Sequence, residues 1–117
     1  METAEAPRKR SMPIRGSRTG RPIMALLDVL GRRWALRVLW ELQHGPLPFR
    51  ALRERCDAVS PSVLNARLGE LRELGVIDAT EDGYALTAEG RSLGELLLPL
   101  DVWARRQAAR RARCRGE

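Results

Sequence analysis

The feature that most constrains this chain is an amphipathic segment with helix signals at both ends, residues 60–77, SPSVLNARLGELRELGVI. Ser60 is a good N-cap, and the proline after it suits a first helical turn because its missing N–H needs no partner there. Gly75 suits the left-handed conformation that ends many helices. The spacing of the leucines predicts a helix over 61–74 with one apolar face, formed by Leu64, Leu68 and Leu71.

The opposite face of this predicted helix carries small and polar residues, namely Ser62, Asn65, Ala66 and Gly69. Such residues form neither a charged solvent face nor a core. Ser and Asn can hydrogen-bond base edges or phosphates, whereas Ala and Gly allow a close approach, and Ala can meet a thymine methyl. We interpret this face as one that contacts DNA; the alternative is a solvated face whose residues are indifferent.

Other periodic segments flank this helix in a defined order. Apolar spacing predicts four further helices, over about 23–30, 34–43, 49–56 and 88–111. Thr87 is a good N-cap for the last of them. VIDAT and YALT flank EDG, which predicts a β-hairpin before the last helix. The predicted fold is mainly α with a small hairpin, in the order α-α-α-α-β-β-α. This is the layout of a winged helix-turn-helix in which CDAVS is the turn and 61–74 the recognition helix.

Positive charge is concentrated at the two ends of the chain. The net charge of the chain is +6. Residues 1–22 carry six Lys/Arg and two acids, and residues 105–117 carry six Arg and one acid. The middle of the chain, residues 23–104, carries nine Arg and twelve acids. Such charge favours nucleic acid or another anionic partner. The arginines of 105–115 either form a solvated helix end or follow the DNA backbone.

No set of residues for catalysis or metal binding is evident. The single histidine, His44, and two distant cysteines, Cys56 and Cys114, cannot complete a zinc site or a nucleophilic triad, and no glycine-rich loop follows a strand. We therefore expect a non-enzyme without metal or cofactor. No apolar run approaches the roughly 18 residues of a membrane span, and no secretory signal is present, so we expect no membrane association and a cytoplasmic location.

Four stretches together resemble the HxlR family of winged-helix transcriptional regulators: LGRRWALRVLWEL (30–42), LPFRALRERC (47–56), VSPSVLNARLGELRELGVI (59–77) and YALTAEGRSL (84–93). The resemblance covers about residues 21–104, ending near Trp103. It implies double-stranded DNA binding as a homodimer, dimer contacts through the terminal helices, and regulation of nearby genes.

We accordingly divide the chain into three parts. These are a flexible basic arm (1–20), a winged helix-turn-helix domain with dimerising first and last helices (21–104), and an Arg-rich C-terminal helix end and tail (105–117). The leucines of the last helix either fold back on the core or meet a partner subunit.

The chain departs in three respects from the pattern that the resemblance implies. Arg21 stands where thiol-sensing members carry a cysteine, so sensing by that route is absent; Cys56 is either a substitute or a small buried hydrophobe. Pro48 replaces an arginine that contacts phosphate. Glu81 and Asp82 place negative charge at the wing tip, which repels phosphate. As a hypothesis, arginines of the arm take over minor-groove contact, namely Arg15, Arg18 and Arg21.

The candidate DNA-binding residues lie on and before the recognition helix: Ser60, Ser62, Asn65, Ala66, Arg67, Arg50 and Arg53. Arg67 either reaches DNA or pairs with Glu70 or Glu41. The predicted function is a sequence-specific transcriptional regulator, a dimer that reads a two-fold operator with helix 61–74 in the major groove. The alternatives are a winged-helix protein–protein adaptor without DNA binding, and a repressor gated by a small-molecule effector in a dimer-interface pocket.

Overall fold

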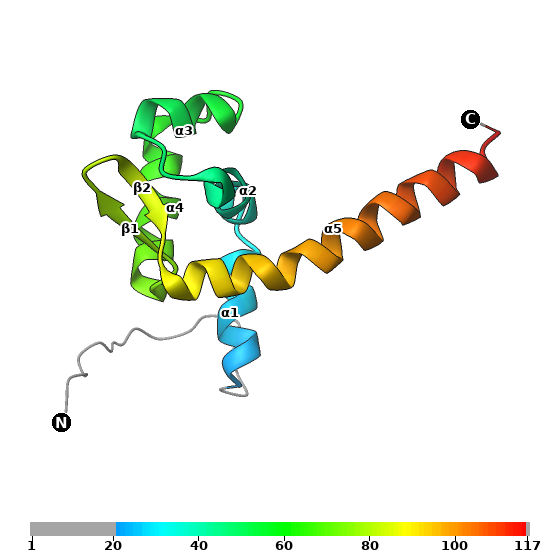
Figure 1. The fold of residues 1–117 in the computed structure, drawn as a ribbon, viewed down its shortest axis with the longest axis horizontal. Coiled ribbons are helices and arrows are strands. Elements are labelled where there is room, and N and C mark those ends of the chain that lie inside the picture. Colours follow the sequence, from blue (N-terminus) through cyan, green and yellow to red (C-terminus); the bar gives the residue numbers. More distant parts are fainter. Residues whose placement is uncertain (1–20, 117) are drawn as a thin grey trace. The chain divides into compact units, whose positions relative to one another are not determined.

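The structure, a computed structural model, describes residues 21–116, and its contacts divide the chain into two compact units between Arg33 and Trp34. The described part of the first unit contains one helix, α1 (Pro22–Leu30). The second unit contains the remaining elements, which Figure 1 labels: α2 (Ala35–Glu41), the 3₁₀ turn η2 (Leu42–His44), α3 (Phe49–Arg55), α4 (Pro61–Leu74), β1 (Ile77–Thr80), β2 (Gly83–Leu86) and α5 (Ala88–Cys114). The predicted order of helices and hairpin is confirmed. The predicted flexible arm, residues 1–20, lies outside the described residues.

The two helices with the clearest N-terminal signals begin where the sequence predicts. The Ser60 Oγ accepts a hydrogen bond from the Val63 N–H at 3.2 Å and caps α4, which ends at Gly75 with φ 89°. The Thr87 Oγ1 accepts one from the Gly90 N–H at 3.0 Å and caps α5. Each cap satisfies an amide that has no partner within its own helix. The helix α5 continues through Pro99 to Cys114, three residues beyond the prediction.

The core of the second unit lies where α2, α3 and α4 meet the start of the hairpin. The leucines of α4 are its centre, since Leu64 and Leu71 are completely buried and Leu68 is 2% exposed. Their burial confirms the predicted apolar face. It also fixes the rotation of α4, because the residues between these leucines must then point outward.

The hairpin is a two-stranded antiparallel sheet in which Ile77 pairs with Leu86 and Thr80 with Gly83. A contact that the sequence did not predict extends it: the Leu47 N–H donates to the Tyr84 carbonyl at 2.9 Å, and the Tyr84 N–H donates to the Leu47 carbonyl at 2.8 Å. Gly83 has φ 117°, and a Cβ there would lie 2.4 Å from the Leu47 carbonyl carbon. Glycine is thus required where the α2–α3 connection meets the wing.

Candidate nucleic-acid interface

The turn between α3 and α4 is built from two successive residues in the left-handed conformation, Asp57 (φ 59°) and Ala58 (φ 57°). Arg53 holds this turn from both its backbone and its side chain. Its carbonyl accepts from the Ala58 N–H at 3.0 Å, and its Nε donates to the Val59 carbonyl at 2.6 Å. Arg53, a candidate DNA contact, therefore has a structural role that the sequence did not reveal, because its partner is a backbone atom.

Ion pairs tie α2 to α3 and to this turn. The Arg37 Nε donates to Glu41 Oε2 at 2.8 Å, and a second guanidinium nitrogen donates to the Arg55 carbonyl. Arg55 also reaches the other Glu41 oxygen at 3.4 Å, and Arg37 lies 3.8 Å from the Asp57 carboxylate. The hydrogen bond to Glu41 is the main cause that raises the pKa of Arg37, so the guanidinium stays charged. These contacts fix where α4 begins relative to α2.

The front face of α4, formed by Ser62, Asn65, Ala66 and Gly69, is exposed along its length. The Ser62 hydroxyl lies 3.4 Å from that of Ser60, which places two hydroxyls at the start of the helix. At Gly69 a Cβ would meet no heavy atom within 4 Å. None of the described chain covers this face, so a groove of a second molecule can approach it.

The arginines near this face differ in whether their side chains are exposed or already paired with a carboxylate. Arg67 is 17% exposed in its side chain and lies 3.1 Å from Glu70 through its Nε. Of the two roles weighed for Arg67, this geometry favours the pairing with Glu70. Arg50, on α3, is exposed, and no ion pair in the described residues involves it.

The tip of the wing is acidic and exposed. Glu81 and Asp82 form the turn between β1 and β2, and the Thr80 Oγ1 stabilises it by donating to the Gly83 carbonyl at 2.7 Å and accepting from the Asp82 N–H at 3.2 Å. The two carboxylates therefore lie at the position that would enter a minor groove, where phosphates would repel them.

The cysteines occupy opposite environments. Cys56, at the end of α3, is completely buried, and burial raises the pKa of its thiol. Cys114 is exposed near the end of α5. Of the two roles weighed for Cys56, the small buried hydrophobe fits this environment. Within residues 21–116, no cluster of His, Cys, Asp and Glu could hold a metal ion.

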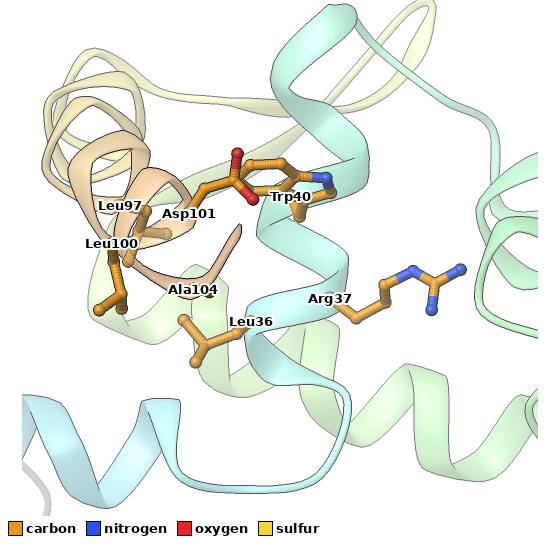
Figure 2. Close-up of a pocket in the computed structure, with 7 residues that line it drawn as sticks. All are labelled: Leu36, Arg37, Trp40, Leu97, Leu100, Asp101 and Ala104. Atoms are coloured by element: carbon orange, nitrogen blue, oxygen red, sulfur yellow. The ribbon is translucent and has the colours of Figure 1, made fainter. Parts of the chain in front are cut away.

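An apolar groove of about 310 Å³ lies between α2 and α5. Figure 2 shows Leu36 and Trp40 of α2 facing Leu97 and Leu100 of α5, with the Arg37 guanidinium directed away from the groove; Asp101 also lines the groove. Leu36 and Leu100 are 41% and 57% exposed, so both walls of the groove keep apolar surface uncovered.

A strained turn that orients an exposed helix, followed by a two-stranded hairpin, defines a winged helix-turn-helix protein. The chain belongs to the HxlR-like helix-turn-helix family, whose model matches residues 29–112. The resemblance seen in the sequence is therefore confirmed.

Relatives and solved structures agree with this assignment. The chain is 26% identical over 94 residues to the uncharacterized HTH-type transcriptional regulator YybR of Bacillus subtilis (strain 168), covering 74% of this chain and 75% of that protein. It is 26% identical over 84 residues to the HTH-type transcriptional regulator YodB of the same organism, covering 66% and 75%. The crystal structure of quinone-bound YodB from B. subtilis matches with a TM-score of 0.67 at 26% identity, covering 72% of this chain and 96% of that one. The reduced form of YodB matches with a TM-score of 0.62 at 26% identity, covering 72% and 90%.

This protein is therefore a transcriptional regulator of the helix-turn-helix type, in a family that consists of regulators rather than enzymes. DNA binding is the activity that the family implies. No helix among the described residues is long and apolar enough to cross a membrane.

Proposed function

We propose that this protein binds a two-fold operator as a homodimer, with α4 of each protomer in a major groove and half-sites about one helical turn, ~34 Å, apart. The single observation that carries the proposal is the exposed front of α4 behind its leucine-packed back. On this face, Asn65 can make a bidentate contact to adenine, while Ala66 and Gly69 allow the helix backbone to come close to the base edges. Ser60 and Ser62, at the N-terminal end of α4, can donate hydrogen bonds to phosphate.

Uncovered apolar side chains support the dimer. On α5, Leu96, Leu100 and Trp103 are 71%, 57% and 53% exposed, and α1 exposes Ile23 and Leu27 to 53% and 50%. The predicted apolar stripe of α5 thus only partly faces the core of its own unit, at Leu93 and Leu97. Large apolar side chains exposed on a helix in this way are typical of a protein–protein interface. The dimerising first and last helices predicted from the resemblance are the surfaces that we propose for it.

Asn65→Ala is expected to reduce the preference for the operator over a scrambled duplex by about 1–3 kcal/mol, because alanine cannot make the bidentate hydrogen bonds to one base. The operator is first obtained by selection from random duplexes with the wild-type protein. Competition binding at fixed salt then measures the preference, and sedimentation of the same complexes gives two protomers per operator.

Glu89→Ala is the control, since Glu89 is exposed and lies on α5 rather than on the front face of α4. It should leave the operator preference within error of the wild type. An unchanged preference for Asn65→Ala would remove Asn65 from the site. A wild-type protein that shows no salt-dependent binding to any duplex would instead support the protein–protein adaptor.

A second candidate is gating of DNA binding by a small apolar effector. The α2–α5 groove of about 310 Å³ supports it, since ligand sites of this size are mostly apolar with few polar groups. A quinone-bound state exists for YodB. A ligand-dependent change in operator affinity would separate this candidate from an ungated regulator.

Thiol-reactive ligands are expected to discriminate between the two cysteines. At neutral pH, p-benzoquinone or iodoacetamide should modify the exposed Cys114 at least about tenfold faster than Cys56, because burial raises the pKa of the Cys56 thiol and blocks access to it. Mass spectrometry of peptides from the folded protein measures the two rates, and both cysteines should react alike in denaturant. Equal rates in the folded protein would show that the Cys56 thiol is accessible. They would then favour the alternative in which Cys56 substitutes for the thiol-sensing cysteine.

A further inference from the structure

The stretch from Val102 to Gly116, which includes the C-terminal half of α5, carries six arginines and no acidic residue. Figure 1 shows this half of the helix extending beyond α2, α3, α4 and the hairpin, and residues 102–106 are exposed. The stretch differs from the rest of the described chain, where arginines are interspersed with Asp and Glu.

Three of these arginines form a row along one side of the helix. Arg106, Arg110 and Arg113 are spaced i, i+4 and i+7, which places them one above the other, and all three are exposed. By the helical period, this row points roughly opposite to Leu97 and Ala104, which line the groove with α2. The row therefore lies on a different side of α5 from the side that faces α2.

No carboxylate in the described residues pairs with the row. Arg105, immediately before it, pairs with Asp101 at 3.0 Å, and Asp101 is the last acidic residue of the helix. Several arginines elsewhere pair with a carboxylate, as Arg72 does with Asp78 at 3.3 Å. Like charges at these helical spacings destabilise a helix, so the row carries a repulsion that an anionic partner would relieve.

The geometry of the row fits the phosphates of a nucleic-acid strand. From Arg106 to Arg113 the helix rises by roughly 10 Å, and phosphates follow one strand of a duplex at about 3.4 Å along its axis, so the row spans about three of them. Guanidinium groups bind phosphate through paired N–H donors and do not lose their charge at neutral pH.

We propose that the arginine row (Arg106, Arg110 and Arg113) binds phosphates of duplex DNA outside the bases that α4 reads. This inference rests on the proposed function. It accounts for how this protein can bind a polyanion although its wing tip is acidic and acidic residues outnumber arginines within residues 23–104. Contacts of this kind position a protein on DNA and add affinity without selecting a sequence.

The test replaces the row by glutamine (Arg106→Gln, Arg110→Gln and Arg113→Gln together) in the full chain, which keeps a helix-forming residue at each position. Binding to the selected operator and to a scrambled duplex of equal length is measured over a range of salt concentrations. We expect both affinities to fall by the same factor, at least about tenfold at low salt. The slope of log affinity against log salt should decrease in magnitude by about five, because the two protomers of the dimer together lose six phosphate contacts, each worth roughly 0.9 in the slope.

The matched control replaces the same three arginines by lysine, which keeps the charge and should keep the slope. If the glutamine variant keeps the wild-type salt slope, the inference about the arginine row is overturned. The proposed function would still be supported if the wild type prefers the operator and Asn65→Ala loses that preference. Dissociation of the glutamine variant into monomers under conditions in which the wild type is dimeric also overturns it, since the row would then act in assembly. If the wild type binds no duplex, the proposed function and this inference fail together.

Discussion

Replacing Gly90 by alanine is expected to lower the free energy of unfolding by about 3 kcal/mol or more. A Cβ at Gly90 would lie 1.9 Å from the Val76 carbonyl oxygen and 2.9 Å from its carbonyl carbon. These are backbone atoms, so no side-chain rotation can relieve the overlap. The same oxygen accepts the Thr87 N–H at 3.0 Å, and the Thr87 hydroxyl donates to the Gly75 carbonyl at 2.6 Å. The start of α5 would have to separate from the end of α4, and these bonds would break.

Gly94→Ala is the matched control, one helical turn further along α5. A Cβ at Gly94 meets nothing within 4 Å, so this variant should gain roughly 0.5–1 kcal/mol from helix propensity. Urea unfolding at one fixed protomer concentration measures both changes, because the stability of the proposed dimer would depend on concentration. A Gly90→Ala variant as stable as Gly94→Ala would contradict the close packing between α5 and Val76.

Leu64→Ala is expected to destabilise the protein by about 2–5 kcal/mol. Leu64 is completely buried at the centre of the core that α4 forms with α2 and α3, and truncation leaves a cavity that the neighbouring helices fill only in part. A loss of this size is a large fraction of the stability of a domain this small. Thermal or urea unfolding followed by circular dichroism measures it.

The neighbouring variant Asn65→Ala separates stability from recognition. Asn65 is exposed, so its replacement should change the free energy of unfolding by no more than about 0.5 kcal/mol while reducing the operator preference. A large loss of stability in Asn65→Ala, or none in Leu64→Ala, would mean that the two faces of α4 are assigned the wrong way round.

The close packing at Gly90 gives a physical reason for a motif that the chain shares with the HxlR family. In YALTAEG, Thr87 both caps α5 and binds back to Gly75, and Gly90 allows the helix to pass against Val76. The threonine and the glycine therefore act together to join the end of α4 to the start of α5. The motif is a packing device rather than a binding site.

Local signals in the sequence were sufficient for the elements of the fold and for the two faces of α4. The Ser60 and Thr87 caps, the left-handed Gly75 and the leucine period act over a few residues, and the structure has each of them as predicted. The resemblance to the HxlR family was likewise visible in short motifs, and the family model confirms it.

Tertiary structure alone decided which polar and apolar groups make contacts within the chain and which remain exposed on its surface. Side-chain patterns do not identify the partners in the hydrogen bond from Arg53 to the Val59 carbonyl or in the β-bridge between Leu47 and Tyr84. The complete burial of Cys56 likewise decides between two roles that the sequence left open. Backbone atoms look alike in every sequence, so no pattern of residue types reveals which carbonyl a guanidinium will meet. The exposure of the α5 stripe depends in the same way on how far the helix extends beyond the elements it packs on, and that distance is a property of the assembled chain.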